Sequence, residues 1–273
     1  IPVSATAGGS IVTVTAKHKG TCGNNIDLRT GLYGEPMPTS LIVTVTAMAS
    51  GTGDPAPGDL ATMIGQRWFR YVALGINDAA TLAAWHAESQ TRYKPPVQAG
   101  FRAFTAMRGD YAAAVTYGSS KNYEHIATLA IGINPITTWE AAAMLAGAAA
   151  PKLYNNPVES LEGTPLVGMV ATSYYDWTQS NSLLFKGMSV LQYAKDGSCT
   201  IKRIISMYQT RADGSTDDAY LDINATEVME RIRYEQRMAA IKRFTGTAAA
   251  KTNEGYKPGL RITTEDDVRA MLL

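Results

Sequence analysis

Strand-like and helix-like segments alternate three times through the middle of this chain, and that alternation limits the possible folds more than any other feature. Runs of apolar, β-branched and aromatic residues predict strands, and longer runs that follow a capping residue predict helices. Strands are expected at 68–74, 101–107 and 126–131, and helices at 60–66, 77–93, 110–117 and 137–150. Strand–helix–strand units at this spacing are typical of a mostly parallel sheet covered by helices.

Two nearly identical, alternating runs precede this region. Residues 10–16 and 40–47 consist mainly of valine, isoleucine and threonine, which favour strands, and the two runs could pair in one sheet. The segment 50–59 that follows is rich in glycine and proline, which do not continue a strand. The sequence therefore predicts an N-terminal β segment that a linker joins to the α/β region.

A hairpin and a helix are expected in the last third of the chain. Residues 187–194 and 199–207 predict two strands, and Asp196-Gly197 between them favours a hairpin turn because such turns need positive φ. A polar loop at 210–218 and a helix from about 226 to 244 come next.

The expected fold class is therefore α/β, with a mixed-sheet α/β middle domain and a C-terminal α+β domain made of the hairpin and the helix. A chain of 273 residues is long enough for two cores. The stretch 155–181 is rich in loop-forming residues and contains two prolines, which suits a crossing between domains. We expect an N-terminal β segment and linker at 1–54, the α/β domain at 55–181 and the C-terminal domain at 182–273.

Composition argues against several classes of partner. Lysine and arginine total 25 against 24 aspartate and glutamate, whereas proteins that bind nucleic acid usually carry a basic excess. No apolar run approaches the ~20 residues that a membrane-spanning helix needs. Cys22 and Cys199 lie too far apart in sequence for a disulfide framework, and we expect both to be buried and reduced. We therefore expect neither nucleic acid nor membrane as a partner.

No motif in the sequence indicates catalytic, cofactor-binding or metal-ligating residues. The glycine-rich run 51–58 lacks the Gly-Lys-Ser/Thr end of a phosphate loop, and the three histidines have no metal-ligand spacing. The acidic loop around Asp213 and Asp217 does not match a calcium loop, so a solvated turn is the better interpretation. The alternative that remains is an enzyme or small-molecule binding protein with a site where the parallel strands end, near 75–78, 107–110 and 131–135.

The C-terminal helix combines favourable capping with positive charge. Asn224 or Thr226 can cap it, and Glu227 and Glu230 lie in its first turns, near the positive end of the helix dipole. An apolar stripe is expected from Val228, Ile232, Ala239 and Ile241, and positive charge comes from Arg231, Arg233, Arg237, Lys242 and Arg243. The helix is either a solvated amphipathic helix or a docking face for an acidic protein surface.

Four segments carry a resemblance to a known family. They are 13–27 (Thr-Val-Thr-Ala-Lys-His-Lys-Gly-Thr-Cys-Gly-Asn-Asn-Ile-Asp), 181–188 (Asn-Ser-Leu-Leu-Phe-Lys-Gly-Met), 205–224 with the Arg231-Ile-Arg233 helix, and 258–264 (Pro-Gly-Leu-Arg-Ile-Thr-Thr). In this order and spacing the chain resembles contractile phage tail sheath proteins of the Mu-like branch, from about Gly9 to Leu273. Such proteins usually have an additional N-terminal region and a C-terminal arm, so the chain corresponds to a core fragment of one. The stretch 245–253 fits the family poorly.

The resemblance implies a structural protein and not an enzyme. It implies a subunit that polymerises helically around a tail tube and contracts to drive the tube through the host envelope, without cofactors. The implied partners are other copies of the chain, joined by strand exchange, the tail tube protein, and the baseplate and tail terminator proteins. The subunit would be made in the host cytoplasm and located in the virion tail. Residues 182–273 would form the sheath assembly domain, its hairpin would receive strands from neighbouring copies, and the five cationic side chains of the helix would face the tube.

Overall fold

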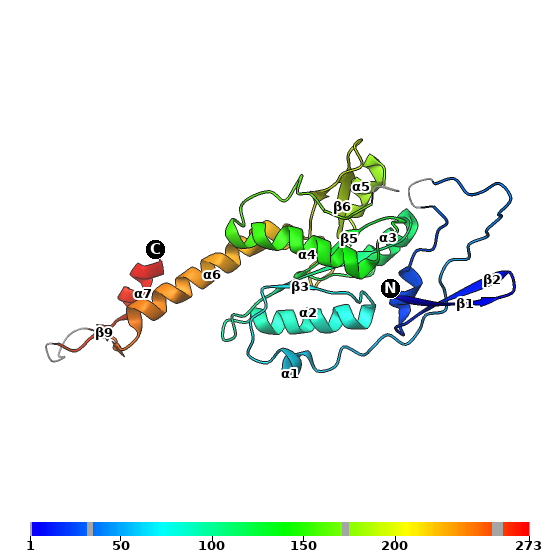
Figure 1. The fold of residues 1–273 in the computed structure, drawn as a ribbon. Coiled ribbons are helices and arrows are strands. Elements are labelled where there is room, and N and C mark those ends of the chain that lie inside the picture. The colour runs from blue at the N-terminus through cyan, green and yellow to red at the C-terminus, as the bar shows by residue number, and fades with distance from the viewer. Residues whose placement is uncertain (1, 32–34, 171–174, 253–258, 273) are drawn as a thin grey trace. The chain divides into compact units, whose positions relative to one another are not determined.

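The computed structural model describes residues 2–31, 35–170, 175–252 and 259–272 (Figure 1). The chain forms two compact units, residues 1–225 and 226–273. Pro258, the first residue of one segment that carries the family resemblance, lies outside the described residues.

The first unit is built on a five-stranded mixed sheet, as the sequence predicts. The strand order is β3 (Tyr71–Ala73), β4 (Arg102–Met107), β5 (Ile126–Ala130), β6 (Met188–Tyr193) and β7 (Cys199–Arg203). The pairs from β3 to β6 are parallel, and β7 is antiparallel to β6. The expected α/β fold class with a mixed sheet is therefore confirmed.

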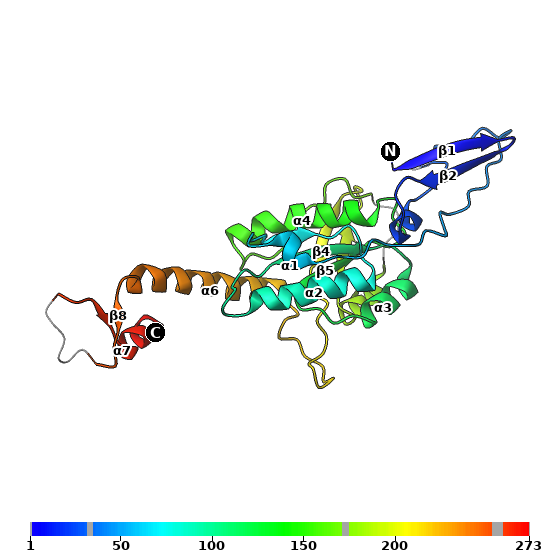
Figure 2. The same ribbon diagram turned by 90° about the horizontal axis from the view of Figure 1, so that it is seen from below.

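Helices cover both faces of this sheet. They are α1 (Leu60–Ile64), α2 (Ala79–Tyr93), α3 (Tyr111–Ser119), α4 (Thr138–Asn155) and α5 (Trp177–Leu184). Figures 1 and 2 show α4 and α2 on opposite sides of the strands. Because successive residues of a strand point to opposite faces, β4 and β5 supply both cores and are buried along their whole length.

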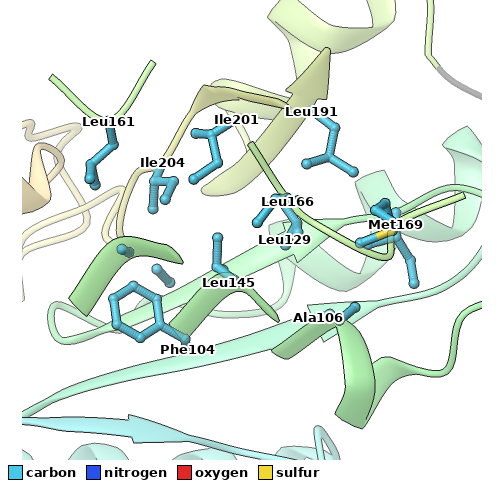
Figure 3. Packing of buried hydrophobic residues seen from close by; sticks show 14 of the residues in the cluster. Phe104, Ala106, Leu129, Leu145, Leu161, Leu166, Met169, Leu191, Ile201 and Ile204 are labelled. Atoms are coloured by element: carbon cyan, nitrogen blue, oxygen red, sulfur yellow. The ribbon is translucent and has the colours of Figure 1, made fainter. Parts of the chain in front are cut away.

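The core on the α4 side contains Phe104 and Leu129 from the strands and Leu145 from the helix, all fully buried (Figure 3). The core on the other side contains Ile126 from β5, Leu82 from α2 and residues from α3 and α5. The small residues of α4 allow close packing on the strands.

Side-chain caps begin most of these helices. Asp59, Asp78, Asp110 and Thr137 each accept a hydrogen bond from a backbone N–H in the first turn of their helix. Helix α5 was not predicted, and most of it lies in the stretch expected to be loop, although Asp176 and Gln179 form a capping box at its start. Strand β3 is shorter than expected, because Trp68 lies outside the ladder and its indole N–H donates to Gly100 O at 2.7 Å.

Gly118 allows α3 to approach the start of β6. A Cβ at this position would lie 2.3 Å from Lys186 O and 2.8 Å from Met188 Cγ. We expect Gly118→Ala to lower the free energy of unfolding by about 1–3 kcal/mol, because backbone atoms would have to move. Gly147→Ala in α4 is the matched control: its Cβ would meet nothing within 4 Å, so a gain of roughly 0.5–1 kcal/mol is expected. Urea unfolding of both variants measures the difference, and a destabilised control with an unaffected Gly118→Ala would contradict this account.

The pairing considered for the two N-terminal runs is wrong. Strand β2 (Ile11–Ala16) pairs antiparallel with β1 (Val3–Gly8), from Val3 opposite Ala16 to Gly8 opposite Ile11. Residues 41–47 belong to no strand. The reason is local: a short turn joins β1 to β2, so β1 reaches β2 without the loop closure that 41–47 would need.

The five-stranded sheet extends across the domain boundary that was expected between residues 181 and 182. Strands β6 and β7 lie beyond that limit but pair with β5, and the compact first unit continues to residue 225. The division into 1–54, 55–181 and 182–273 as functional domains stays a prediction. The second unit contains most of α6 (Ile223–Phe244), the short parallel pair β8 (Ala248–Ala249) and β9 (Ile262–Thr263), and α7 (Glu265–Leu272).

Candidate assembly surface

All five cationic residues singled out by sequence lie on α6. Two of them are paired within the helix: Arg231 Nε lies 2.9 Å from Glu235 Oε1, and Arg233 contacts the Glu230 carboxylate. The guanidinium of Arg243 lies 5.7 Å from the centre of the Phe244 ring. Arg237 and Lys242 are exposed and make no ion pair with the residues that the structure describes. These two therefore have the charge that is most available to a partner.

The apolar side chains of α6 do not form a buried stripe. From residue 234 to 243 every side chain except the half-buried Ala240 is exposed. Ile232 and Ile241, two members of the expected stripe, are exposed to 44 % and 48 %. The stripe expected from Val228, Ile232, Ala239 and Ile241 is therefore not buried against the rest of the chain beyond Val228. A helix exposed on all sides offers surface for contact with another molecule.

The hairpin of β6 and β7 offers little free edge. Strand β6 pairs with β5 on one side and with β7 on the other. The outer edge of β7 bonds to a neighbouring segment: Gly163 N donates to Ile201 O, Ile201 N to Thr164 O, and Leu166 N to Cys199 O, at 2.8–2.9 Å. The expectation that this hairpin receives strands from neighbouring copies is therefore wrong along Cys199–Ile201.

Hydrogen bonds join the segments that meet at the ends of the parallel strands, where the sequence left an enzyme site open. Asn77 Nδ2 donates to Ala106 O, and Tyr117 Oη donates to Asn77 O, both at 2.8 Å. Tyr175 Oη donates to Gly109 O at 2.9 Å. Burial raises the pKa of the Tyr175 hydroxyl to about 12, so this side chain is a neutral donor near neutral pH.

A partly buried group of hydrogen bonds around Arg108 lies further along the same edge. Arg108 Nε donates to Asn134 O at 2.6 Å, and its guanidinium also contacts the carboxylate of Asp27 from the N-terminal segment. The fully buried Asn134 donates to Val170 O at 2.6 Å. Polar groups at this edge thus bind one another and hold loops together, which weakens the enzyme alternative. The pairing of Asp27 with Arg108 could not be predicted, because nothing local in the sequence relates residues so far apart.

The acidic loop is held by turn hydrogen bonds. The Asp213 carboxylate accepts bonds from Ser215 N and Oγ at 2.9 and 2.6 Å. Hydrogen bonds from Arg211 and Tyr208 lower the pKa of the Asp217 carboxyl from its usual value to about 2. The solvated-turn interpretation describes these carboxylates better than a cation site does.

Within the described ranges, no three His, Cys, Asp or Glu side chains are grouped so that they could hold a metal ion. The same part of the chain contains no helix long and apolar enough to span a bilayer. Cys199 is buried, Cys22 is half-buried, and neither forms a disulfide. Burial raises the pKa of the Cys199 thiol to about 12.

The structure thus combines a mixed sheet covered by helices, strand ends that bond to neighbouring segments, and a largely exposed C-terminal helix. The family model described as the phage tail sheath protein central domain matches residues 50–207, more than half of the chain. The chain therefore belongs to the phage tail sheath protein family. Members of this family are components of virion tails.

Individual relatives agree with this assignment. The Mu-like prophage FluMu tail sheath protein of Haemophilus influenzae is 28 % identical over 277 residues, and the match covers all of this chain but 57 % of that relative. Among solved structures, the sheath tail protein of Desulfitobacterium hafniense has a TM-score of 0.52 at 17 % identity, covering 90 % of this chain and 66 % of that one. The sheath tail protein Lin1278 of Listeria innocua has a TM-score of 0.53 at 14 % identity, covering 77 % and 48 %. The two structures support the fold, and the Mu-like relative confirms the resemblance drawn from sequence.

Proposed function

We propose that this chain is the central part of a structural subunit of a contractile tail sheath. The subunit polymerises helically around a tail tube and contracts to drive the tube through the host envelope. The match of the family's central domain to residues 50–207 is the observation that carries this proposal. The polar groups that join the loops at the strand ends support a non-enzymatic role, because they are engaged with one another.

The proposed partners are other copies of the chain, the tail tube protein, and the baseplate and tail terminator proteins. The subunit is made in the host cytoplasm and assembles outside the tube, with no nucleic acid or membrane as partner. The family's helical assemblies support self-association. The near balance of 25 basic and 24 acidic residues supports the absence of nucleic acid among the partners.

Electron microscopy of the full-length protein tests this function. Negative staining of the protein mixed with tail tube protein is expected to show hollow, regularly striated tubes that are wider than the tube protein alone. Particles that stay small in this mixture, together with unmodified bare tubes, would count against a sheath subunit.

We further propose that α6 faces the tail tube through Arg231, Arg233, Arg237, Lys242 and Arg243. Arg237 and Lys242 contribute most to this contact, because neither side chain forms an ion pair with a described residue. The double variant Arg237→Glu/Lys242→Glu is expected to weaken co-assembly with the tube and to alter its dependence on salt. Each exposed pair contributes only about 0.2–1 kcal/mol, but the contact repeats along a filament.

Co-sedimentation with preformed tubes at several salt concentrations measures this effect. The matched control is Lys94→Glu/Lys195→Glu, which makes the same charge change at two exposed positions in the first unit. Equal co-sedimentation of the double variant and the unmodified protein at every salt concentration would disprove the assignment of α6 to the tube.

A further inference from the structure

Hydrogen bonds hold the N-terminal segment together as one piece. The Asp54 carboxylate accepts hydrogen bonds from Thr21 N and Thr21 Oγ1 at 2.6 and 2.7 Å. Asn24 Nδ2 donates to Gly51 O at 3.2 Å, and Gly51 N donates to Asn24 Oδ1 at 2.8 Å. These bonds tie the base of the β1–β2 hairpin to the chain that leads into α1. The described part of residues 2–54 is called the N-terminal module below.

Apolar packing does not explain how this module is attached to the α/β body, which is the five-stranded sheet with helices α1 to α5. Neither buried core contains a residue of the module. Within the module, Ile11 and Ile42 are exposed to 67 % and 91 %. The connecting residues 55–59 belong to no helix or strand and include two prolines and a glycine. Polar contacts therefore have to supply much of the attachment.

One polar contact between the module and the α/β body is charged and mostly buried. The Arg108 guanidinium contacts the Asp27 carboxylate, and the two side chains are only 16 % and 13 % exposed. The other oxygen of the same carboxylate contacts Arg29, which belongs to the module. Asp27 therefore joins one guanidinium from the module to one from the α/β body through charge-assisted hydrogen bonds.

The α/β body fixes its own side of this contact. Arg108 follows β4, and its Nε donates to Asn134 O at 2.6 Å. Asn134 is fully buried; its side-chain nitrogen donates to Val170 O at 2.6 Å, and its side-chain oxygen accepts from Ile136 N at 3.0 Å. Because the donors of a guanidinium form a rigid fork, the bond from Nε also sets the direction of the remaining N–H groups. The Asp27 carboxylate thus meets a donor that is already oriented.

We propose that Asp27 and Arg108 form an electrostatic latch that makes the N-terminal module and the α/β body move as one rigid body. With the latch closed, the module is held both by the ion pair and by residues 55–59. With the ion pair removed, the connecting residues remain, and their glycine lets the module change direction. The latch therefore decides whether the direction of the β1–β2 hairpin is fixed. This inference goes beyond the sheath function and does not depend on it.

Distance measurements between two spin labels test the latch. In the 273-residue chain with Cys22→Ser, one label is attached at Thr13→Cys on β2 and the other at Ala143→Cys on α4, both at exposed positions. The remaining thiol, Cys199, is buried. Double electron–electron resonance is expected to give a narrow distribution of distances in this protein. Asp27→Ala should widen the distribution about twofold, because it removes the carboxylate that the guanidinium binds.

Two further variants separate the latch from a general loosening of the module. Asp27→Asn keeps the shape of the side chain and one acceptor oxygen but removes the charge, so it should also widen the distribution. Arg29→Met removes the partner of Asp27 that lies within the module, so the distribution should stay narrow. Circular dichroism spectra of all three variants should coincide with that of the labelled parent, because neither substituted residue belongs to a buried core.

Three results would overturn the latch: a distribution that is already wide in the labelled parent, one that stays narrow in Asp27→Ala, or equal widening in Arg29→Met and Asp27→Ala. A distribution that stays narrow in Asp27→Asn would contradict its electrostatic nature. None of these measurements involves the tail tube protein, so failure of the latch and failure of the sheath function are distinguishable.

Discussion

Phe104→Ala is expected to lower the free energy of unfolding by about 3–5 kcal/mol. Phe104 lies on β4, is fully buried, and belongs to the core between the sheet and α4 (Figure 3). The ring of Tyr71 lies 6.4 Å from its ring centre, so truncation also removes an aromatic contact. The cavity would be surrounded by side chains from two strands and a helix, which cannot all move inward at once.

Phe185→Ala is the matched control, because Phe185 follows α5 and is 77 % exposed. The same substitution there should change stability by no more than roughly 0.5 kcal/mol. Urea unfolding followed by far-ultraviolet circular dichroism measures both variants. Similar losses for the two phenylalanines would mean that the core does not lie where the structure places it.

Arg92→Met is expected to cost about 3–5 kcal/mol, because it removes one partner of a buried ion pair. Arg92 is 6 % exposed and lies in the last turn of α2. Its Nε lies 2.5 Å from Glu88 Oε1, and its other nitrogens donate to Arg67 O at 3.0 Å and Gly65 O at 2.8 Å. Methionine would leave the Glu88 carboxylate and two backbone carbonyls without these donors.

The double variant Glu88→Gln/Arg92→Met should recover part of the loss, because the uncompensated charge is gone. A pair with the same spacing on the surface provides the control: Arg269 and Glu265 on α7 are 69 % and 74 % exposed. Arg269→Met should cost less than about 1 kcal/mol. If Arg92→Met cost no more than Arg269→Met in urea unfolding, the importance of the buried pair would be disproved.

Local signals in the sequence predicted most of the α/β region. Helices α2, α3 and α4 begin within about a residue of where the sequence placed them, at the caps Asp78, Asp110 and Thr137, because a cap acts on N–H groups only two or three residues away. The strands β4 and β5 could also be predicted from the sequence, since strands buried on both faces are continuously apolar. The family could also be inferred, because its segments occur in order along the chain.

Contacts between distant segments could not be predicted in this way. The sequence of residues 42–47 is identical to that of β2, yet only β2 is a strand, because β1 is connected to it by a short turn. The hairpin of β6 and β7 was expected to have a free edge, but residues 163–166 occupy part of it. On α6 the cationic residues were identified, whereas the pairing of Arg231 and Arg233 with glutamates needed side-chain positions.

The sequence by itself determined the order of strands and helices, the caps that begin the helices and the membership of the sheath family. These depend on interactions within a few residues or on motifs read in order. Only the tertiary structure decided which strand edges are filled, which charges are paired and how the loops at the strand ends are joined. Those features depend on contacts between residues tens of positions apart, such as Asp27 with Arg108. Closing such long loops costs conformational entropy, which only the packing of the whole fold offsets.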